Sequence, residues 1–368
     1  MRIMHLLKHG VQGNGHVHVA VDLACSQAGA GHEVSFVSSG GSYDQLLTDH
    51  GVQVVNTPGS GGVRGTAASG LGLLRVARDL RPDIMHAHMM SSAVLGYGVA
   101  RLVGATLVTT MHNSFERHSV LMRLGRVVVA VSEAERRLLL SRGYPDRKVV
   151  TVVNGANGSP REALPDDDIG PLHRPAVMTL CGLHPRKAVG DVVMAFAAVH
   201  PEFPDWHLNV VGWGPDRERL ENLVAERGLQ SAVHFLGSTT APRPLLTAAD
   251  IFASASLADP CPLAVAEARA AGCAIVATAV GGVPEVLDHG RAGQLVSPGK
   301  PEAMAAAFRT LMGDPEVLAA WRARALHGSE YFTVARMTED YERIYASVLR
   351  ADRRSRSAVR SVASISSR

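Results

Sequence analysis

The chain has 368 residues, of which 46% are hydrophobic, 19% charged and 5% aromatic, and its formal net charge is +3. This length exceeds one typical core and fits two domains, while the apolar content excludes a wholly disordered protein. The small net charge gives no reason to expect a nucleic-acid-binding protein.

The first half alternates short β-branched runs with longer helical stretches, a pattern typical of parallel strands joined by crossover helices. In the helix predicted over 17–30, Val17, Val21, Ala24 and Ala28 share one face. Strands are predicted at Arg2–Leu7, Glu33–Ser38, Val52–Asn56, Asp83–Ala87, Thr106–Met111, Val127–Val131 and Val149–Val153.

A polar, proline-containing stretch over 157–174 has neither period and is predicted to be an interdomain linker. The second half then restarts the alternation, with helices from about Asp191 and over Arg217–Arg227. We expect an α/β fold of two doubly wound parallel sheets that face one another, with domains at 1–165 and 175–328. Strands are predicted at Ala176–Cys181, His207–Val211, Val233–Leu236, Ile251–Ser254, Ala274–Thr278 and Gly293–Val296.

Beyond Pro301 the sequence predicts helices only, and the segment 329–350 is expected to pack back on the first domain. Residues 351–368 are rich in serine and arginine with the single acid Asp352, and we expect a disordered basic tail. Two interpretations of the tail stay open, a solvated extension and electrostatic contact with an anionic membrane surface.

The cysteines and the apolar runs bear on the compartment. Cys25, Cys181, Cys261 and Cys273 lie far apart and form no C-x-x-C pair, which argues against a disulfide framework or a structural zinc site. The N-terminus lacks an apolar region followed by a cleavage site, and no uncharged apolar run reaches about 18 residues. We therefore expect a cytoplasmic protein without a signal peptide or membrane span.

The segment 250–287 carries the strongest functional pattern. A strand ends in the polar loop 256–260, and a helix is expected to begin near Pro262, because proline suits a first helical turn. The backbone N–H groups of Cys261, Leu263 and Ala264 would then favour an anion such as a diphosphate.

Two carboxylates flank this predicted helix start. Asp259 lies just before it and Glu267 one to two turns after it, and such acceptors are suited to paired hydroxyls of ribose or sugar. The next strand ends at Gly281-Gly282, followed by Glu285. Close approach of the backbone to a ligand and a tight turn with a capping acid both explain the glycines.

The pattern from Asp259 to Glu285 resembles the signature of retaining glycosyltransferase family 4, whose members have the GT-B fold of two facing Rossmann-like domains. In that family a Glu, seven residues and then Glu-Ala open this helix. Here Asp259 stands for the first Glu, while Glu267 and Ala268 are in register. The likeness extends from the first strand to about Arg350.

The resemblance implies roles in the second domain. Glu267 is similar to the family carboxylate that holds the donor ribose, and Asp259 to the one that contacts the transferred sugar. Lys187 matches the lysine that neutralises the diphosphate, and Arg186 is expected to replace the family arginine, whose position holds Leu183. By the same resemblance the strand ends at Gly212 and Gly237 border the nucleotide base.

In the first domain the resemblance places Gly13 and Gly15 in a loop that approaches the diphosphate. His112 resembles the family histidine that contacts the donor sugar near the reacting centre, and His16 is expected to reach the acceptor. His88 is predicted to line the cleft on the acceptor side or to lie in the core. A metal is not expected, because no carboxylate or cysteine cluster accompanies His86 and His88.

A second metal signal, the Asp166-x-Asp168 pair, falls in the linker and is assigned to solvent. The resemblance therefore implies retaining transfer without a cofactor, from a UDP- or GDP-sugar co-substrate to a hydroxyl of a small-molecule, lipid or glycan acceptor. UDP-N-acetylglucosamine or UDP-glucose is favoured, and the composition is typical of high-GC bacteria. The alternatives are a sugar-nucleotide epimerase of GT-B fold and a non-catalytic sugar-nucleotide-binding protein.

Overall fold

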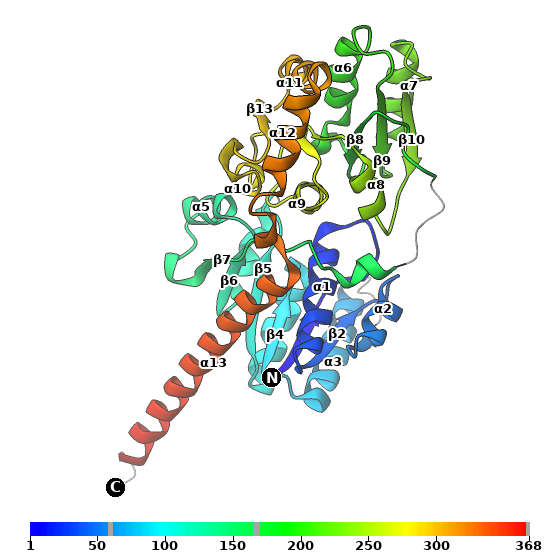
Figure 1. The fold of residues 1–368 in the computed structure, drawn as a ribbon. Coiled ribbons are helices and arrows are strands. Elements are labelled where there is room, and N and C mark those ends of the chain that lie inside the picture. Colours follow the sequence, from blue (N-terminus) through cyan, green and yellow to red (C-terminus); the bar gives the residue numbers. More distant parts are fainter. Residues whose placement is uncertain (58–61, 116, 165–169, 366–368) are drawn as a thin grey trace.

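The computed structural model describes residues 1–57, 62–115, 117–164 and 170–365. Figure 1 shows two α/β domains, one above the other, with the C-terminal helix crossing from the second domain back over the first. The pair Asp166 and Asp168, assigned to solvent from the sequence, lies outside the described residues.

The first domain is built on a seven-stranded parallel sheet of order β3-β2-β1-β4-β5-β6-β7. The order reverses between β1 and β4, and open α/β sheets bind ligands at the carboxyl ends of strands beside such a reversal. Its strands are β1 (Arg2–Leu6), β2 (Glu33–Ser38), β3 (Gln53–Asn56), β4 (Ile84–Ala87), β5 (Thr106–Met111), β6 (Val127–Ala130) and β7 (Val149–Thr151). Its helices are α1 (Gly15–Gly29), α2 (Asp44–Asp49), α3 (Gly62–Leu80), α4 (Met90–Val103) and α5 (Glu133–Ser141).

The second domain is built on a six-stranded parallel sheet of order β10-β9-β8-β11-β12-β13, which reverses between β8 and β11. Its strands are β8 (Ala176–Leu180), β9 (His207–Val211), β10 (Val233–Gly237), β11 (Ile251–Ser254), β12 (Ala274–Thr278) and β13 (Gln294–Val296). Its helices are α6 (Val189–Val199), α7 (Arg217–Glu226), α8 (Arg243–Ala248), α9 (Leu263–Ala270) and α10 (Val283–Val286). The two sheets confirm the predicted doubly wound α/β fold.

Helices cover both faces of the second sheet, so its central strands β11 and β12 are mainly apolar. Neighbouring residues along one strand enter opposite cores: Ile251 packs in one buried cluster and Phe252 in the other. Ile275 and Val276 of β12 divide in the same way. This two-sided burial explains why the strands show continuous β-branched runs instead of polar alternation.

Three helices follow the second sheet: α11 (Pro301–Gly313), α12 (Pro315–Leu326) and α13 (Val334–Ile365). The first part of α13 packs on the first domain, where Tyr341 and Tyr345 are fully buried beside Ile3 and Val108. Thr110 and Tyr341 join this helix to β5 through a hydrogen bond of 2.9 Å between their hydroxyl oxygens. The C-terminal helix therefore ties the two domains together (Figure 1).

The sequence predicts a disordered tail over 351–368, whereas the structure continues α13 through residues 351–365. Arginine and alanine are good helix formers, and a helix already fixed by packing extends without a second nucleation step. Asp352 also anchors this segment, because it accepts hydrogen bonds from Thr106 Oγ1 at 2.7 Å and Arg126 Nε at 3.1 Å. Residues 366–368 lie outside the described residues.

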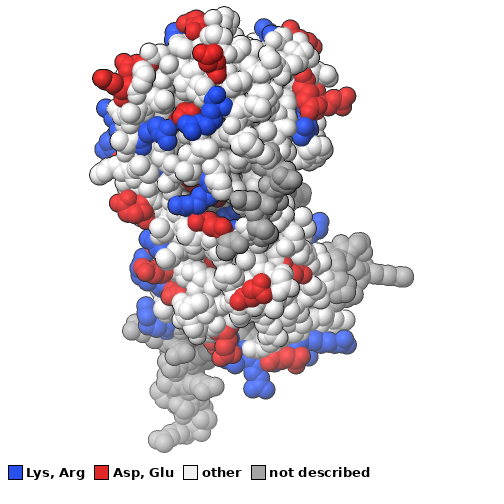
Figure 2. Space-filling model, turned by 45° about the vertical axis from the view of Figure 1, so that its right-hand side comes forward, with Lys and Arg blue, Asp and Glu red and all other residues white. Residues whose placement is uncertain are grey.

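Basic and acidic side chains are interspersed on the face shown in Figure 2, and much of that face carries neither. Among the described residues, no helix combines the length and apolarity needed to cross a bilayer.

Candidate active site

The N-terminus of α9 lies at the boundary between the domains. Its N-cap is Pro262, with φ −75° and ψ 111°, so the helix begins one residue later than a proline in the first turn would give. The N–H groups of Leu263 and Ala264 have no acceptor among the described residues, as expected for a first helical turn. Gly15, at the start of α1, lies against this point: a Cβ on Gly15 would be 3.8 Å from Leu263 Cδ1.

Gly13 precedes α1 in the same loop and has φ +86°, a conformation that favours glycine. The structure thus brings the predicted loop of the first domain to the predicted anion site of the second. Cys261, just before Pro262, is partly buried, and loss of solvation raises the pKa of its thiol to about 12. That thiol stays protonated at neutral pH and is a poor nucleophile.

The predicted cations and carboxylate meet beside α9. Lys187 Nζ donates to Asp259 Oδ2 at 2.5 Å, although the two residues are 72 apart in the chain. Asp259 is only 7% exposed, so this lysine compensates a largely buried charge. Arg186 Nη1 donates to the Ala258 carbonyl oxygen at 2.6 Å.

Arg186 also reaches the other domain. Its guanidinium carbon lies 5.0 Å from the ring centroid of Phe115, which follows β5, within the range of a cation–π contact. Arg186 and Lys187 therefore lie on one side of the interdomain boundary, with Asp259 between them and α9. This juxtaposition supports the interpretation that Arg186 takes the place of a family arginine at Leu183.

Gly281 and Gly282 approach protein backbone. A Cβ on Gly281, where φ is +51°, would lie 2.0 Å from the Asp259 carbonyl oxygen, and one on Gly282 would lie 2.2 Å from that of Pro260. Gly282 N–H also donates to the Asp259 carbonyl at 3.0 Å. Gly281 and Gly282 therefore pack against the loop that carries Asp259. Of the two explanations for the glycines, the structure favours a tight turn over close contact with a ligand.

Glu285 is a capping acid for a helix of the other domain. Its two carboxylate oxygens accept hydrogen bonds from the N–H groups of Glu133 and Ala134, at 2.7 and 2.6 Å. Those groups begin α5, where unpaired donors and the helix dipole favour an anion. The sequence predicts the capping acid but not its partner, which lies more than 150 residues away.

Glu267, in the second turn of α9, meets a buried ion pair that the sequence analysis missed. Arg161 Nε and Nη2 donate to the two oxygens of Asp22 at 2.9 and 3.0 Å, and Ser159 Oγ donates to the same carboxylate at 2.7 Å. Glu267 Oε1 lies 3.6 Å from Arg161 Nη2. Burial raises the pKa of Glu267, and the nearby Arg161 opposes that shift.

A cavity of about 320 Å³ opens beside Glu267, a volume in the range of small-molecule sites. The linker contributes Asn157 and Arg161 to its wall, and the start of α8 contributes Pro242 and Leu246. Apolar walls next to a carboxylate and an arginine suit a flat polar ring attached to a diol.

The strand ends predicted to border a nucleotide base lie at the same edge of the second sheet. Gly212 N–H donates to the Gly237 carbonyl oxygen at 2.6 Å, which joins the ends of β9 and β10. Gly212 has φ +139°, and a Cβ there would overlap the Cys181 carbonyl oxygen at 1.9 Å. Trp213 is 64% exposed, with the Arg217 guanidinium carbon 4.8 Å from its ring centroid.

His112 follows β5 directly, at the carboxyl edge of the first sheet. Its Nε2 lies 3.1 Å from His88 Nδ1, and the His16 ring lies 6.0 Å from its own, centroid to centroid. Burial, with a smaller contribution from His16, lowers the pKa of His112 to about 3. The imidazole is therefore neutral at physiological pH and offers one donor and one acceptor.

The sequence predicts His88 either to line the cleft on the acceptor side or to lie in the core, and the structure places it in the core. His88 is 3% exposed, and its Nε2 and Nδ1 lie 3.0 Å from His5 Nδ1 and 3.1 Å from His112 Nε2. The side chain therefore lies behind His112 and presents no unpaired nitrogen to a substrate. His16 lies in the first turn of α1, next to Gly15, and its contact with an acceptor stays a prediction.

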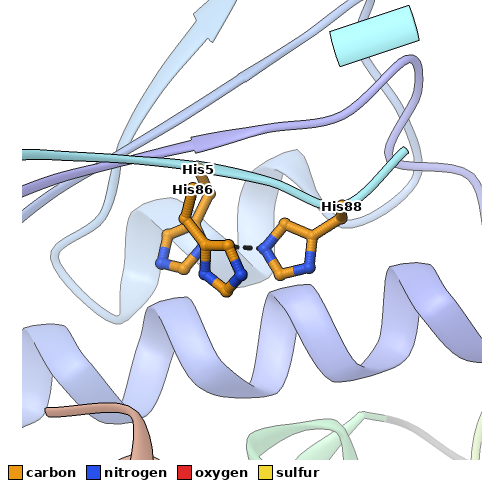
Figure 3. Close-up of side chains that lie close together, drawn as sticks. All are labelled: His5, His86 and His88. Carbon is orange, nitrogen blue, oxygen red and sulfur yellow. Dashed lines mark hydrogen bonds between the residues drawn. The ribbon is translucent and has the colours of Figure 1, made fainter. Parts of the chain in front are cut away.

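Three buried histidines, His5, His86 and His88, gather in the first domain (Figure 3), with one nitrogen of each within 4.8 Å of the others. His86 is hydrogen-bonded to Thr110 and Tyr345, and His5 to Gln27, in addition to the pairs formed by His88. All six ring nitrogens thus have protein partners, which favours a hydrogen-bonded core cluster.

These histidines make the fold sensitive to acid. Burial lowers the pKa of His5 to about 4, and those of His86 and His88 lie well below the ordinary value. Below about pH 6.5 the unfolded chain binds protons that the folded protein does not bind until about pH 4. The free energy of unfolding should therefore decrease as the pH is lowered through this window, by about 1.4 kcal/mol per pH unit for each of these histidines.

Thermal unfolding between about pH 7.5 and pH 5 measures this effect. A His5→Gln variant should show a shallower dependence of Tm on pH, and replacement of the exposed His327 is the control. A Tm that is constant over this interval would contradict the prediction.

With this geometry in place, comparisons with known proteins decide the family. Residues 13–158 match the model for Glycosyltransferase Family 4, and residues 174–314 match the model for Glycosyl transferases group 1. The chain belongs to these glycosyltransferases. It is a GT-B enzyme, and the sequence-based family assignment is confirmed.

Individual proteins are similar to this glycosyltransferase over different shares of their length. An N-acetyl-alpha-D-glucosaminyl L-malate synthase of Bacillus anthracis is 26% identical, over 91% of this chain and 94% of that protein. An exopolysaccharide phosphotransferase of Streptomyces coelicolor is 34% identical, but the match spans 45% of this chain and only 18% of that protein. The structure of Anabaena HepE in complex with UDP-glucose is 20% identical with a TM-score of 0.80, covering 94% of this chain and 100% of HepE.

Proposed function

We propose that this glycosyltransferase moves a hexosyl group from a UDP-sugar, of the UDP-glucose or UDP-N-acetylglucosamine type, to an acceptor hydroxyl with retention of configuration. The observation that carries the proposal is the arrangement at α9, whose N-terminus lies beside the Lys187–Asp259 pair and one turn before Glu267. The name of the Bacillus anthracis relative and the UDP-glucose bound to HepE support the donor class.

In this proposal the donor lies along α9. The diphosphate accepts hydrogen bonds from the N–H groups of Leu263 and Ala264, and Arg186 and Lys187 supply positive charge. The ribose hydroxyls donate to Glu267, and the base occupies the adjacent cavity of about 320 Å³, whose lining includes neither Gly212 nor Gly237. The transferred sugar then lies toward Asp259.

The chemical step breaks the bond between the anomeric carbon and the diphosphate oxygen, and forms a bond from the same carbon to the acceptor oxygen. Negative charge develops on the departing diphosphate, where Lys187 and the α9 N-terminus stabilise it. The acceptor proton passes to the departing diphosphate, because Lys187 and Arg161 engage Asp259 and Glu267. Attack from the face that the diphosphate leaves gives retention.

The cations of the protein meet the electrostatic requirement of the leaving group, so the proposal includes no metal or other cofactor. It places the acceptor near His16 and His112, in the first domain. The Arg186–Phe115 and Glu285–α5 contacts join the domains around this point and would exclude water from the bond that breaks. The separated cysteines favour a cytoplasmic location.

Release of UDP in the presence of acceptor tests this function. A panel of nucleotide sugars is first ranked by the Tm increase that each gives, because a ligand of the folded state raises stability by mass action. The best donor is then incubated with an acceptor library. Acceptor-dependent UDP release and an α-linked product by NMR support retaining transfer from an α-linked donor, whereas donor binding without turnover favours the binding-protein alternative.

A Glu267→Gln variant should bind UDP about 10- to 100-fold more weakly, because hydrogen bonds to a charged group contribute roughly 1.5–3 kcal/mol. Arg161 remains paired with Asp22 in this variant, so the fold should be retained. Isothermal titration with UDP measures the change. Glu302→Gln, at the exposed start of α11, is the matched control, and an unchanged Kd for Glu267→Gln would contradict the assignment of the ribose.

A further inference from the structure

A chain of hydrogen bonds runs from the core of the first domain to His112. Gln27 Oε1 lies 2.9 Å from His5 Nε2, and His5 Nδ1 lies 3.0 Å from His88 Nε2. His88 Nδ1 then lies 3.1 Å from His112 Nε2. In each of the three imidazoles, one ring nitrogen is hydrogen-bonded to the neighbour on the core side. In His5 and His88 the other nitrogen is hydrogen-bonded to the neighbour on the active-site side.

Neutral imidazoles in such a chain must share one direction. Each neutral ring has one N–H donor and one lone-pair acceptor, so adjacent rings can bond only if all their donors point the same way. The two possible directions leave His112 with opposite tautomers. The group at the inner end of the chain selects between them, since it must complement His5.

Gln27 provides that group. The Gln27 side chain presents Oε1 to His5 Nε2, while its own amide Nε2 has no hydrogen-bond partner among the described residues. Because Oε1 can only accept, this orientation of the amide requires the His5 proton on Nε2, and His5 then accepts at Nδ1 from His88. His88 then carries its proton on Nε2 and accepts at Nδ1 from Nε2–H of His112. Nδ1 of His112 is left as a lone pair, and it makes no hydrogen bond to the described residues.

Burial keeps the chain neutral and rigid. Gln27 and His5 are fully buried and His88 nearly so. Burial also lowers the pKa of His5 to about 4 and that of His88 well below its ordinary value. A ring turned to the wrong tautomer would place two donors or two lone pairs against each other, at the cost of an unmade buried hydrogen bond.

We infer that Gln27, acting through His5 and His88, holds His112 as the Nε2–H tautomer, so that its Nδ1 accepts a hydrogen bond from a substrate hydroxyl. Gln27, His5 and His88 are positioning residues, and only His112 touches the substrate. The inference rests on the proposed function for the identity of that substrate. The tautomer itself is a property of the unliganded protein.

The inference assigns a selectivity to His112. The lone pair on His112 Nδ1 can accept a hydrogen bond from a hydroxyl group, but it forms no hydrogen bond with an ether or carbonyl oxygen, because these oxygens carry no hydrogen. Replacing the contacted hydroxyl by fluorine, which cannot donate, should therefore lower kcat/KM as much as removing it, by about tenfold. A series of monodeoxy and monofluoro donor sugars measures this.

NMR of the unliganded protein labelled with ¹⁵N-histidine tests the tautomer directly. Long-range ¹H–¹⁵N correlations distinguish a protonated ring nitrogen from a lone-pair nitrogen, and the signals lost in His112→Asn identify His112. Nε2–H at His112 is expected in the natural protein. Nδ1–H at His112 would overturn the inference, whether or not the protein transfers a sugar.

Variants at the inner end of the chain complete the test. Gln27→Leu removes the acceptor and should give mixed tautomers at His112 with kcat about tenfold lower. His86→Gln is the matched control, since His86 is equally buried but bonds only to Thr110 and Tyr345.

An unchanged tautomer of His112 in Gln27→Leu would overturn the inference. A loss of the Nε2–H signal of His112 in His86→Gln, but not in Gln27→Leu, would also overturn it. If Gln27→Leu does not fold, the NMR measurement on the natural protein carries the test. Failure of UDP release in every variant and in the natural protein would instead contradict the proposed function and leave the tautomer result standing.

Discussion

A Lys187→Met variant is expected to lower kcat by about 10²–10³-fold, the effect of removing one preorganised group that stabilises developing charge. Lys187 is held 2.5 Å from Asp259 and beside the α9 N-terminus, so its ammonium group needs no rearrangement to meet a diphosphate. The loss should fall mainly on kcat, because the charge on the departing diphosphate grows in the transition state.

Two comparisons separate this effect from a loss of structure. Lys187→Arg retains the charge and should recover most of the rate, and Lys300→Met removes an exposed lysine of the same domain and should change nothing measurable. Tm measured in parallel reports the cost of leaving Asp259 unpaired. Initial rates over a range of donor concentrations give the result, and a higher KM with normal kcat would contradict a role in the chemical step.

The strands and their parallel order follow from local sequence, because a strand buried on both faces must be apolar along its length. The runs at Ala274–Thr278 and Ile251–Ser254 illustrate this, and the structure gives them the same bounds. The candidate donor residues follow for a related reason. Asp259 and Glu267 are separated by a helix start, so a single local pattern places both beside the same amides.

The contacts between distant segments leave no such local signal. Glu285 caps α5 from the other domain, and Arg161 lies in a stretch without periodicity, yet pairs with Asp22 on α1. The hydrogen-bonded chain through Gln27 and His5 could not be predicted for the same reason, since the sequence around each residue indicates only a helix or a strand. Only the register of the sheet brings these side chains together.

Two outcomes depend on tertiary packing. The sequence leaves His88 either in the cleft or in the core, and the hydrogen bonds to His5 and His112 place it in the core. The tail was expected to be disordered because its charge suggests solvation, whereas the packed part of α13 provides a helix nucleus for it. In both cases tertiary contacts that the local sequence does not reveal determine the outcome.

An Asp22→Ala variant is expected to lower the free energy of unfolding by about 3–5 kcal/mol, the cost of leaving one member of a buried ion pair uncompensated. Asp22 is fully buried, Arg161 is 4% exposed, and the two form a bidentate pair. Since Ser159 also donates to Asp22, the variant frees a hydroxyl as well as a guanidinium group. Urea denaturation followed by circular dichroism measures the change.

The double variant Asp22→Leu/Arg161→Met tests whether the cost comes from the unpaired charge. It replaces both ions by apolar side chains of similar volume, and should recover much of the stability lost in Asp22→Ala. Arg161 also faces Glu267 at 3.6 Å, so the double variant should bind UDP differently from the natural protein even when it is stable. A decrease in the free energy of unfolding of less than about 1 kcal/mol in Asp22→Ala would contradict a stabilising role of the Asp22–Arg161 pair between the linker and α1.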